Sequence, residues 1–200
     1  IDSTNAEALR TVERGVAAPF LVLAERQTSG RGRRGRRWAS PFAENIYYSL
    51  VLRIDGGMRQ LEGLSLVVGL AVMQTLRGLG VSGAGLKWPN DVLVGRKKIA
   101  GILLELVGDP ADVCHVVLGV GVNVNMQVTD EVDQQWTSMR LESGAAVDRN
   151  HLVAQLGQML QVYLNRHRNG GFAAIQAEWE QSHLWQGRAV SLIAGVNQID

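Results

Sequence analysis

The sequence has few of the residues that cross-link small folds or hold metal ions. It contains one cysteine, Cys114, so no disulfide can form within the chain, and we expect a reducing compartment, the cytoplasm. Cys114 stands among valines and is expected to be a buried strand residue, not a nucleophile. The histidines are scattered at positions 115, 151, 167 and 183, without metal-ligand spacing. The sequence therefore gives no support to a metal cluster or to a Ser-His-Asp catalytic set.

Long apolar runs and an excess of one charge are also missing. The most apolar stretch, residues 64–73, is too short for the ~20 residues that a membrane-spanning helix needs, and no signal peptide is visible. Twenty basic and 19 acidic residues leave a net charge of +1, which argues against bulk attraction to nucleic acid. Neither G-x-x-x-x-G-K-[ST] nor a helix-opening G-x-G-x-x-G occurs. These absences leave a globular domain without a membrane span.

One basic segment stands out, residues 27–38 (QTSGRGRRGRRW), which we call the Gly/Arg loop. It has five arginines and three glycines in the nine positions before Trp38. Glycine lets the backbone approach a ligand closely, and the planar arginine fork suits phosphate and carboxylate groups. The segment predicts a loop that wraps an anion. Taken alone, it is equally compatible with a solvated basic loop or an RGG-like RNA contact.

The hydrophobic pattern predicts an α+β fold with a mixed, largely antiparallel central sheet and helices on one side. Helices are expected at residues 6–14, 59–79, 150–168 and 172–181. Strands are expected at residues 20–24, 45–53, 86–88, 92–94, 98–107 and 113–124, with a further strand beginning at 188. Residues 127–148 look irregular. The chain starts at Ile1 without an initiator methionine and stops inside a strand-like run, so we expect both ends to be truncated or disordered.

Two short stretches combine lysine with turn residues. In Lys87-Trp88-Pro89-Asn90-Asp91, proline fixes φ and should hold the two following polar residues at a defined turn. In residues 97–105 (KKIAGILLE), Lys98 opens an apolar strand and would project from its end into a cleft. Gly101 would let a ligand lie against that strand. An ordinary turn and an edge-strand charge are the alternatives when each stretch is taken singly.

A third stretch, residues 119–125 (GVGVNVN), reads as the end of a strand. Its alternation would place Asn123 and Asn125 on one face. Its two glycines could equally mark a bulge.

Together with Ser3-Thr4-Asn5, these motifs resemble the catalytic domain of biotin protein ligases, the bacterial type sometimes fused to a DNA-binding repressor domain. The matches run in family order from residue 3 to residue 125. The resemblance implies a catalytic domain of the class II aminoacyl-tRNA synthetase/biotin synthetase type over residues 1–183. It also implies that residues 184–200 begin a small SH3-like β-barrel. The implied activity is formation of biotinyl-5′-AMP from biotin and ATP, followed by transfer of biotin to a lysine of a biotin carboxyl carrier protein.

The resemblance also assigns site residues. Lys98 would lie beside the biotin carboxylate and the α-phosphate, Asp91 would position the carrier lysine, and Arg33 would act on the ATP phosphates. The implied biotin-binding residues are Ser3, Thr4, Asn5, Gln27, Gly30, Arg31, Tyr47, Lys98 and Gly101. The implied ATP- and adenylate-binding residues are Arg31, Arg33, Arg34, Arg36, Trp38, Lys87, Asn90 and Asn123. Mg²⁺ is expected without assigned protein ligands, and the Gly/Arg loop is expected to close over the adenylate.

The implied partner is a biotin carboxyl carrier protein, such as an acetyl-CoA carboxylase subunit. Homodimerisation is common in the family, no membrane is implied, and DNA binding would require a helix-turn-helix domain before Ile1. The nearest alternative is a lipoate–protein ligase, which shares the fold and the adenylate chemistry. The complete Gly/Arg motif and Lys87-Trp88-Pro89-Asn90-Asp91 favour biotin. An RNA-binding protein is disfavoured by the near-zero net charge and by the lack of aromatic residues within the arginine run.

Overall fold

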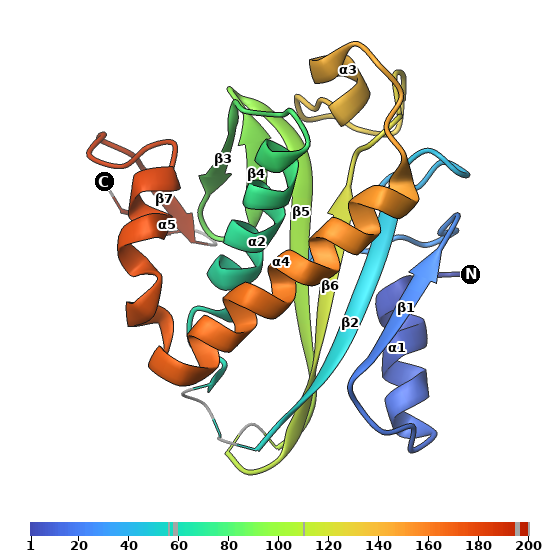
Figure 1. Ribbon diagram of the computed structural model, residues 1–200, viewed down its shortest axis with the longest axis vertical. Helices are drawn as coiled ribbons and strands as arrows, with labels where there is room; N and C mark the ends of the chain where they lie inside the picture. The colour runs from blue at the N-terminus through green and yellow to red at the C-terminus, as the bar shows by residue number, and fades with distance from the viewer. Residues whose placement is uncertain (56, 58–59, 110, 195–196, 200) are drawn as a thin grey trace.

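The fold is built on one six-stranded sheet of order β1-β2-β6-β5-β4-β3 (Figure 1). The computed structural model describes residues 1–55, 57, 60–109, 111–194 and 197–199. The strands are β1 Phe20–Ala24, β2 Ile46–Ile54, β3 Ala84–Lys87, β4 Asp91–Val94, β5 Lys97–Gly108 and β6 Cys114–Val122. Every neighbouring pair in this sheet is antiparallel, which confirms the largely antiparallel sheet expected from the sequence.

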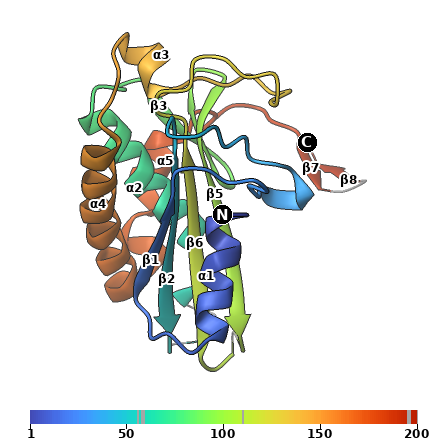
Figure 2. The ribbon, with the colours of Figure 1, turned by 90° about the vertical axis from the view of Figure 1, so that its right-hand side faces the viewer.

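Helices cover both faces of the sheet. They are α1 Thr4–Glu13, α2 Leu64–Gly78, α3 Met139–Ser143, α4 Arg149–Gly170 and α5 Gln176–Ser182, with short 3₁₀ turns at Arg33–Gly35 and Phe172–Ala174. Helices α2 and α4 lie on one face, and α1 lies on the other (Figure 2). The expectation that all helices share one side is therefore wrong for α1. Its Ala8 packs on Val51 and Val117, which alternate along β2 and β6 with the residues that face α2 and α4.

Several element boundaries differ from the sequence-based expectation for local reasons. The helix expected from residue 59 begins at Leu64, because Gly63 adopts a left-handed φ of 69° at its N-cap; residues 58 and 59 lie outside the described ones. The stretch expected to be irregular contains α3, capped by the Ser138 side chain. Cys114 is fully buried in β6 as expected, and burial raises the pKa of its thiol.

The last strand expected from residue 188 begins at Leu192. It forms β7 Leu192–Ala194, which pairs with β8 Asn197–Ile199. Residues 195, 196 and 200 of the expected barrel segment lie outside the described residues, and the division at residue 183 stays a prediction. No helix in the described ranges is long and apolar enough to cross a membrane.

Helix α5 is tied to the core through Glu178, which gives a test of this packing. Its carboxylate accepts hydrogen bonds from Tyr163, from Arg166 Nη1 (2.7 Å) and from Gln74 Nε2 (3.1 Å). Burial raises the pKa of Glu178, but the bonds from these three donors outweigh burial, so the pKa lies below its usual 4.5. Replacing Glu178 by glutamine is expected to lower the free energy of unfolding by about 1–2 kcal/mol at pH 7.

The effect should depend on pH in one direction. Because the folded pKa is depressed, the contribution of Glu178 is complete above pH 4.5 and is lost as the pH falls through the folded value. Urea unfolding at pH 7 and at about pH 3 measures both limits. Glu180→Gln, whose bond from Gln176 is exposed to solvent, is the control. Equal stability of the parent and Glu178→Gln at pH 7 would contradict this account.

Candidate functional site

The face of the sheet toward α1 carries a cavity that collects most of the predicted site residues. The alternation of β2, β5 and β6 points Tyr47, Ser49, Gly101, Glu105 and Gly119 to this face, while their neighbours in sequence pack on α2 and α4. The Gly/Arg loop and the start of α1 close the cavity. Its lining comprises Ser3, Thr4, Asn5, Gln27, Arg31, Gly32, Arg33, Trp38, Tyr47, Tyr48, Asn90, Lys98, Gly101, Ile102, Leu103, Gly119, Val120 and Gly121.

The first turn of α1 is joined to the Gly/Arg loop by hydrogen bonds. Ser3 is the N-cap of α1, and its hydroxyl accepts from Ala6 N (3.5 Å). The Gln27 side-chain carbonyl accepts from the Thr4 backbone N–H (2.8 Å) and from the Thr4 hydroxyl (3.1 Å). The Gln27 amide in turn donates to Ser40 Oγ (3.0 Å). The structure thus brings together three of the predicted biotin-binding residues, Ser3, Thr4 and Gln27, on one wall of the cavity.

A second hydrogen-bond network lies in the cavity wall and includes the lining residues Asn5 and Arg31. Asn5 is only 4% exposed; it accepts from Ser49 Oγ (2.6 Å) and donates to Glu105 Oε2 (2.8 Å). Glu105 also forms an ion pair with the Arg31 guanidinium. A Cβ at Gly119 would lie 2.3 Å from Asn5 Oδ1, so only glycine leaves room for this network. Asn5 is therefore an anchor for the cavity wall, and the Arg31 side chain is held at β5.

A largely buried ion pair lies where the cavity meets the turn between β3 and β4. Lys98 Nζ lies 2.7 Å from Asp91 Oδ1, and the two side chains are 14% and 17% exposed. Lys98 follows the first residue of β5 and Asp91 opens β4, so strand pairing fixes their separation. The prediction that Lys98 projects from a strand end into a cleft is confirmed.

The indole of Trp38 forms the roof of the cavity. A Cβ at Gly121 would lie 2.4 Å from Trp38 Cε2, and one at Gly101 would lie 3.0 Å from Trp38 Cζ3. The two glycines, paired across β5 and β6, therefore let the indole lie on the strand backbone. Lys98 Nζ stands 5.4 Å from the ring centroid. The buried Trp38 Nε1 has no hydrogen-bond partner in the described part of the chain.

A second, smaller pocket lies on the other side of Trp38. Its lining comprises Arg37, Trp38, Ala39, Lys98, Asn123, Met126, Val132, Gln134 and Trp136. Asn123 follows the end of β6; its backbone N–H donates to Ile99 O (2.9 Å) and its side chain to Thr137 O (3.0 Å). Asn125 bonds Val147 instead (3.0 Å). The expected strand face shared by both asparagines is wrong, because β6 stops at Val122.

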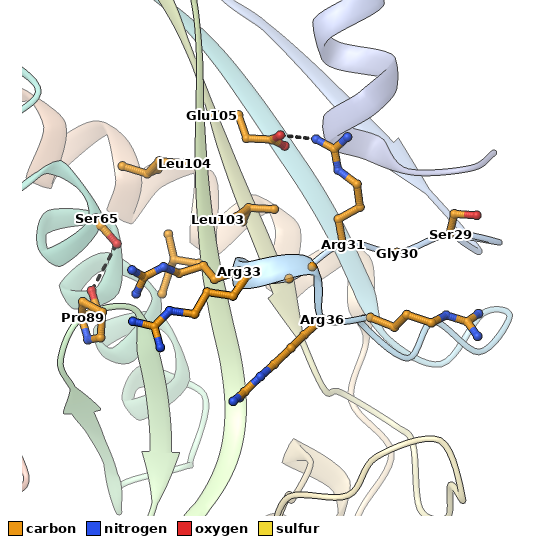
Figure 3. Close-up of a pocket in the computed structure, with 15 residues that line it drawn as sticks. Ser29, Gly30, Arg31, Arg33, Arg36, Ser65, Pro89, Leu103, Leu104 and Glu105 are labelled. Atoms are coloured by element: carbon orange, nitrogen blue, oxygen red, sulfur yellow. Dashed lines mark hydrogen bonds and ion pairs between the residues drawn. The ribbon is translucent and has the colours of Figure 1, made fainter. Parts of the chain in front are cut away.

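The arginines of the loop line an open groove of about 860 Å³ between the loop and β5. The Trp38 backbone N–H donates to Gly30 O (2.9 Å), so the loop folds back on itself. Arg31 points toward Glu105, and Arg33 extends toward Pro89 (Figure 3). Arg33 Nη1 donates to Asn90 Oδ1 (2.9 Å). The predicted phosphate-binding residues Arg33, Arg34 and Arg36 all line this groove.

One predicted residue lies apart from the others. The Lys87 ammonium stands 5.4 Å from the centroid of the Trp185 ring, and Lys87 lines neither cavity nor the arginine groove. Tyr47, in contrast, is placed as expected in the cavity wall. Burial raises the pKa of Tyr47, whose hydroxyl donates to Pro41 O (2.7 Å).

Sequence reasoning assigned no role to Ser40, Ser49, Glu105 and Trp136. Glu105 ends a matching motif, but its partners Arg31 and Asn5 lie 74 and 100 residues away in sequence. The tertiary fold brings them together, because α1 carries Asn5 and the Gly/Arg loop carries Arg31 to the face of β5 that bears Glu105. Trp136 forms a bridge with Lys98 from a segment expected to be irregular. Among the described residues, no group of three or more His, Cys, Asp or Glu could hold a metal ion.

The chain is similar in sequence to known proteins. The bifunctional ligase/repressor BirA of Escherichia coli K12 is 39% identical over 201 residues, which cover all of this chain and 62% of that protein. The chain therefore spans less than two thirds of the length of this relative. The biotin–[acetyl-CoA-carboxylase] ligase of Paracoccus denitrificans is 39% identical over 89% of this chain and 76% of its own length.

Solved structures agree with the sequence comparison. The biotin protein ligase of Aquifex aeolicus in complex with biotin and ATP matches with a TM-score of 0.84 and 30% identity, covering 99% of this chain and 81% of that one. A model of the biotin/lipoate A/B protein ligase family matches residues 1–123, which hold every predicted site residue. The chain belongs to the biotin/lipoate A/B protein ligase family.

Proposed function

We propose that this chain is the catalytic part of a biotin protein ligase that makes biotinyl-5′-AMP from biotin and ATP and then biotinylates a carrier lysine. The observation that carries the proposal is the place of Lys98. Lys98 and Trp38 line both the cavity at α1 and the smaller pocket at Asn123. Two ligands, one in each, would therefore meet at a cation. The names of the relatives, which are biotin ligases, favour biotin over lipoate.

The lining of the cavity at α1 carries the groups that biotin needs; with the Gly/Arg loop in this position the cavity holds about 50 Å³, so the loop would move to admit biotin. Biotin combines a polar ureido ring, an apolar body and a carboxylate tail. Ser3, Thr4 and Gln27 would exchange their mutual hydrogen bonds for bonds to the ureido ring. Tyr47 and the Gly101 backbone would wall the apolar body, with Gly30 and the Arg31 backbone closing the loop side. The carboxylate would then point to Lys98.

The other pocket and the groove suit a nucleotide. Asn123 and Trp38 would flank the adenine, and Trp38 Nε1 would donate to the adenylate. Arg33, Arg34 and Arg36 would neutralise the phosphates in the groove, with Asn90 holding Arg33 in place.

In the first step, a biotin carboxylate oxygen attacks the α-phosphorus, and the bond to pyrophosphate breaks. Lys98 would hold both anions together and stabilise the charge that develops on the α-phosphate. In the second step, the carrier lysine amine attacks the acyl carbon, and AMP leaves. Asp91, beside Lys98, would position that amine and accept its proton. The closed Gly/Arg loop would keep water from the mixed anhydride between the two steps.

We propose that Mg²⁺ would enter the site bound to ATP. The described residues form no carboxylate cluster for it, and Asp91 is already paired with Lys98. ATP phosphates commonly supply most of the ligands of this ion. We therefore assign it no protein ligand and no step.

The proposed transfer of biotin to a lysine requires a protein that carries this lysine. We propose a biotin carboxyl carrier protein, with the reaction taking place in the cytoplasm, in accord with the single buried thiol. A homodimer and the SH3-like segment over residues 184–200 are further parts of this proposal, whereas DNA binding would require a helix-turn-helix domain before Ile1. Sedimentation tests the homodimer.

Transfer of biotin to a carrier tests the proposed function. Incubation with ATP, Mg²⁺, biotin and a recombinant carrier domain is expected to add one biotin to its lysine, as followed by mass spectrometry. Lipoate in place of biotin should give no addition. The proposal would be refuted if the carrier were modified by lipoate but not by biotin, or if it were modified by neither acid.

Glu105 gives a further prediction about the loop. Replacing it by glutamine removes the ion pair with Arg31 and leaves the Arg31 side chain free to move from β5. Since the Arg31 and Glu105 side chains are 42% and 25% exposed, solvent screens the pair. We expect KM for biotin to rise by about 3- to 10-fold, with kcat almost unchanged.

Two measurements separate this effect from general damage. Adding Arg31→Gln to Glu105→Gln should cost little more than either change alone, as a double-mutant cycle would show. Raising the salt concentration should weaken biotin binding in the parent but not in Glu105→Gln. Fully additive effects of the two substitutions would contradict the coupling.

A further inference from the structure

A separate cavity lies on the opposite face of the sheet, between α4 and β2. Its volume is about 430 Å³, within the range of small-molecule sites. Helix α4 crosses this part of the sheet (Figure 1). Leu50 and Leu52 of β2 face Leu160 and Leu164 of α4 across it. The walls therefore suit an apolar body, and none of the residues assigned to biotin or ATP lines them.

Two features of the cavity leave room for a ligand. Tyr48 lines it and is only 3% exposed, and its hydroxyl makes no hydrogen bond to the described residues. The hydroxyl is not one of the polar atoms that are fully buried without a partner, so it reaches solvent and can bond a polar ligand atom. Gly157 lies inside α4, where glycine is unfavourable relative to alanine. A Cβ there would meet nothing within 4 Å, so packing does not require glycine.

The charge at the other end of the cavity is positive. Arg53 and Arg168 line it, and no aspartate or glutamate in the described part of the chain does. Arg53 Nε is bonded to Asp55 (2.8 Å), whereas Arg168 bonds only the neutral Asn165 side chain (2.8 Å) among the described residues. His167 also lines the cavity, with its Nε2 bonded to Glu62 O (2.8 Å). Gly157 and Arg168 stand about 16 Å apart along the helix, at the usual rise per residue.

We propose that this cavity binds an elongated monocarboxylate with an apolar body. The carboxylate binds Arg168, with Arg53 beside it, and the body lies between the leucines of β2 and α4. A polar atom at the far end accepts a hydrogen bond from the Tyr48 hydroxyl. Tyr48 of β2 lines both this cavity and the biotin cavity, and Tyr47 lines only the biotin cavity of the two, so the two sites share one strand.

Isothermal titration with octanoate tests the proposal, with biotin present to fill the other cavity. One octanoate is expected to bind per chain, and 8-hydroxyoctanoate should bind more tightly. Octan-1-ol and octyltrimethylammonium, which lack the carboxylate, should bind at least about tenfold more weakly. Arg168→Gln should weaken octanoate binding by about tenfold, and Tyr48→Phe should remove the advantage of 8-hydroxyoctanoate.

A substitution that fills the cavity gives the decisive test. Gly157→Leu has room for its side chain, should keep the fold and biotin binding, and should abolish octanoate binding. The matched control is Gly78→Leu at the exposed end of α2, where a Cβ also meets nothing within 4 Å. Unchanged octanoate affinity in Gly157→Leu, displacement of octanoate by biotin, or no binding at all would overturn the proposal.

Discussion

Replacing Lys98 by alanine is expected to lower the rate of adenylate formation by about 10²- to 10³-fold, the usual cost of removing one preorganised group that stabilises transition-state charge. Lys98 is the cation common to both ligand cavities, and its ammonium is held by Asp91 at 2.7 Å. The stabilisation is needed most when charge develops on the α-phosphate, so kcat should fall more than KM rises. Single-turnover formation of biotinyl-5′-AMP measures this step directly.

The neighbouring lysine supplies a matched control. Lys97 opens the same strand but is exposed and lines neither cavity, so Lys97→Ala should keep the parent rate. Circular dichroism should show both variants folded. A Lys98→Ala protein that binds biotin and ATP normally and keeps more than about a tenth of the parent rate would contradict the role given to Lys98.

Adding one methyl group at Gly121 is expected to lower kcat/KM by about 10- to 100-fold, since overpacking typically costs 1–3 kcal/mol. The new Cβ would lie 2.4 Å from Trp38 Cε2, and the indole must move. Trp38 separates the two cavities and lies beside Lys98, so its displacement disturbs both ligands. The backbone at Gly121 has an ordinary strand conformation, so alanine itself brings no strain there.

The steric cause can be isolated. Gly78→Ala, at an exposed helix end with free space around the new Cβ, should leave kcat/KM unchanged. Once Trp38 is replaced by alanine, Gly121→Ala should cost almost nothing more, because the clash is gone. A Gly121→Ala enzyme with the parent kcat/KM would show that the indole does not lie where the structure places it.

The strands could be predicted from the sequence because alternation and turn residues act locally. The hairpin of β4 and β5 follows from such local signals, with strand bounds within one residue of those expected. The position of α1 could not be predicted in this way. Val51 and Val117 are as apolar as their neighbours in sequence, so the pattern does not show which face a helix will cover.

The motifs predicted many of the residues that line the cavities but not their contacts. Gln27 was expected to bind a ligand, whereas its bonds to Thr4 and Ser40, which fix its amide, depend on tertiary structure. The same holds for Glu105, whose partners are Asn5 in α1 and Arg31 in the Gly/Arg loop. Lys87 illustrates the opposite case: it lies within a matching motif, yet its side chain packs on Trp185. Sequence order alone does not determine which way a strand-end side chain turns.

Biotin-dependent exchange of labelled pyrophosphate into ATP tests the central claim most directly, because it reports the first step without any carrier protein. The account predicts exchange that requires biotin, is absent with lipoate, and falls by about 10²- to 10³-fold in Lys98→Ala. Exchange without biotin, or no exchange by a folded protein that binds both ligands, would contradict it.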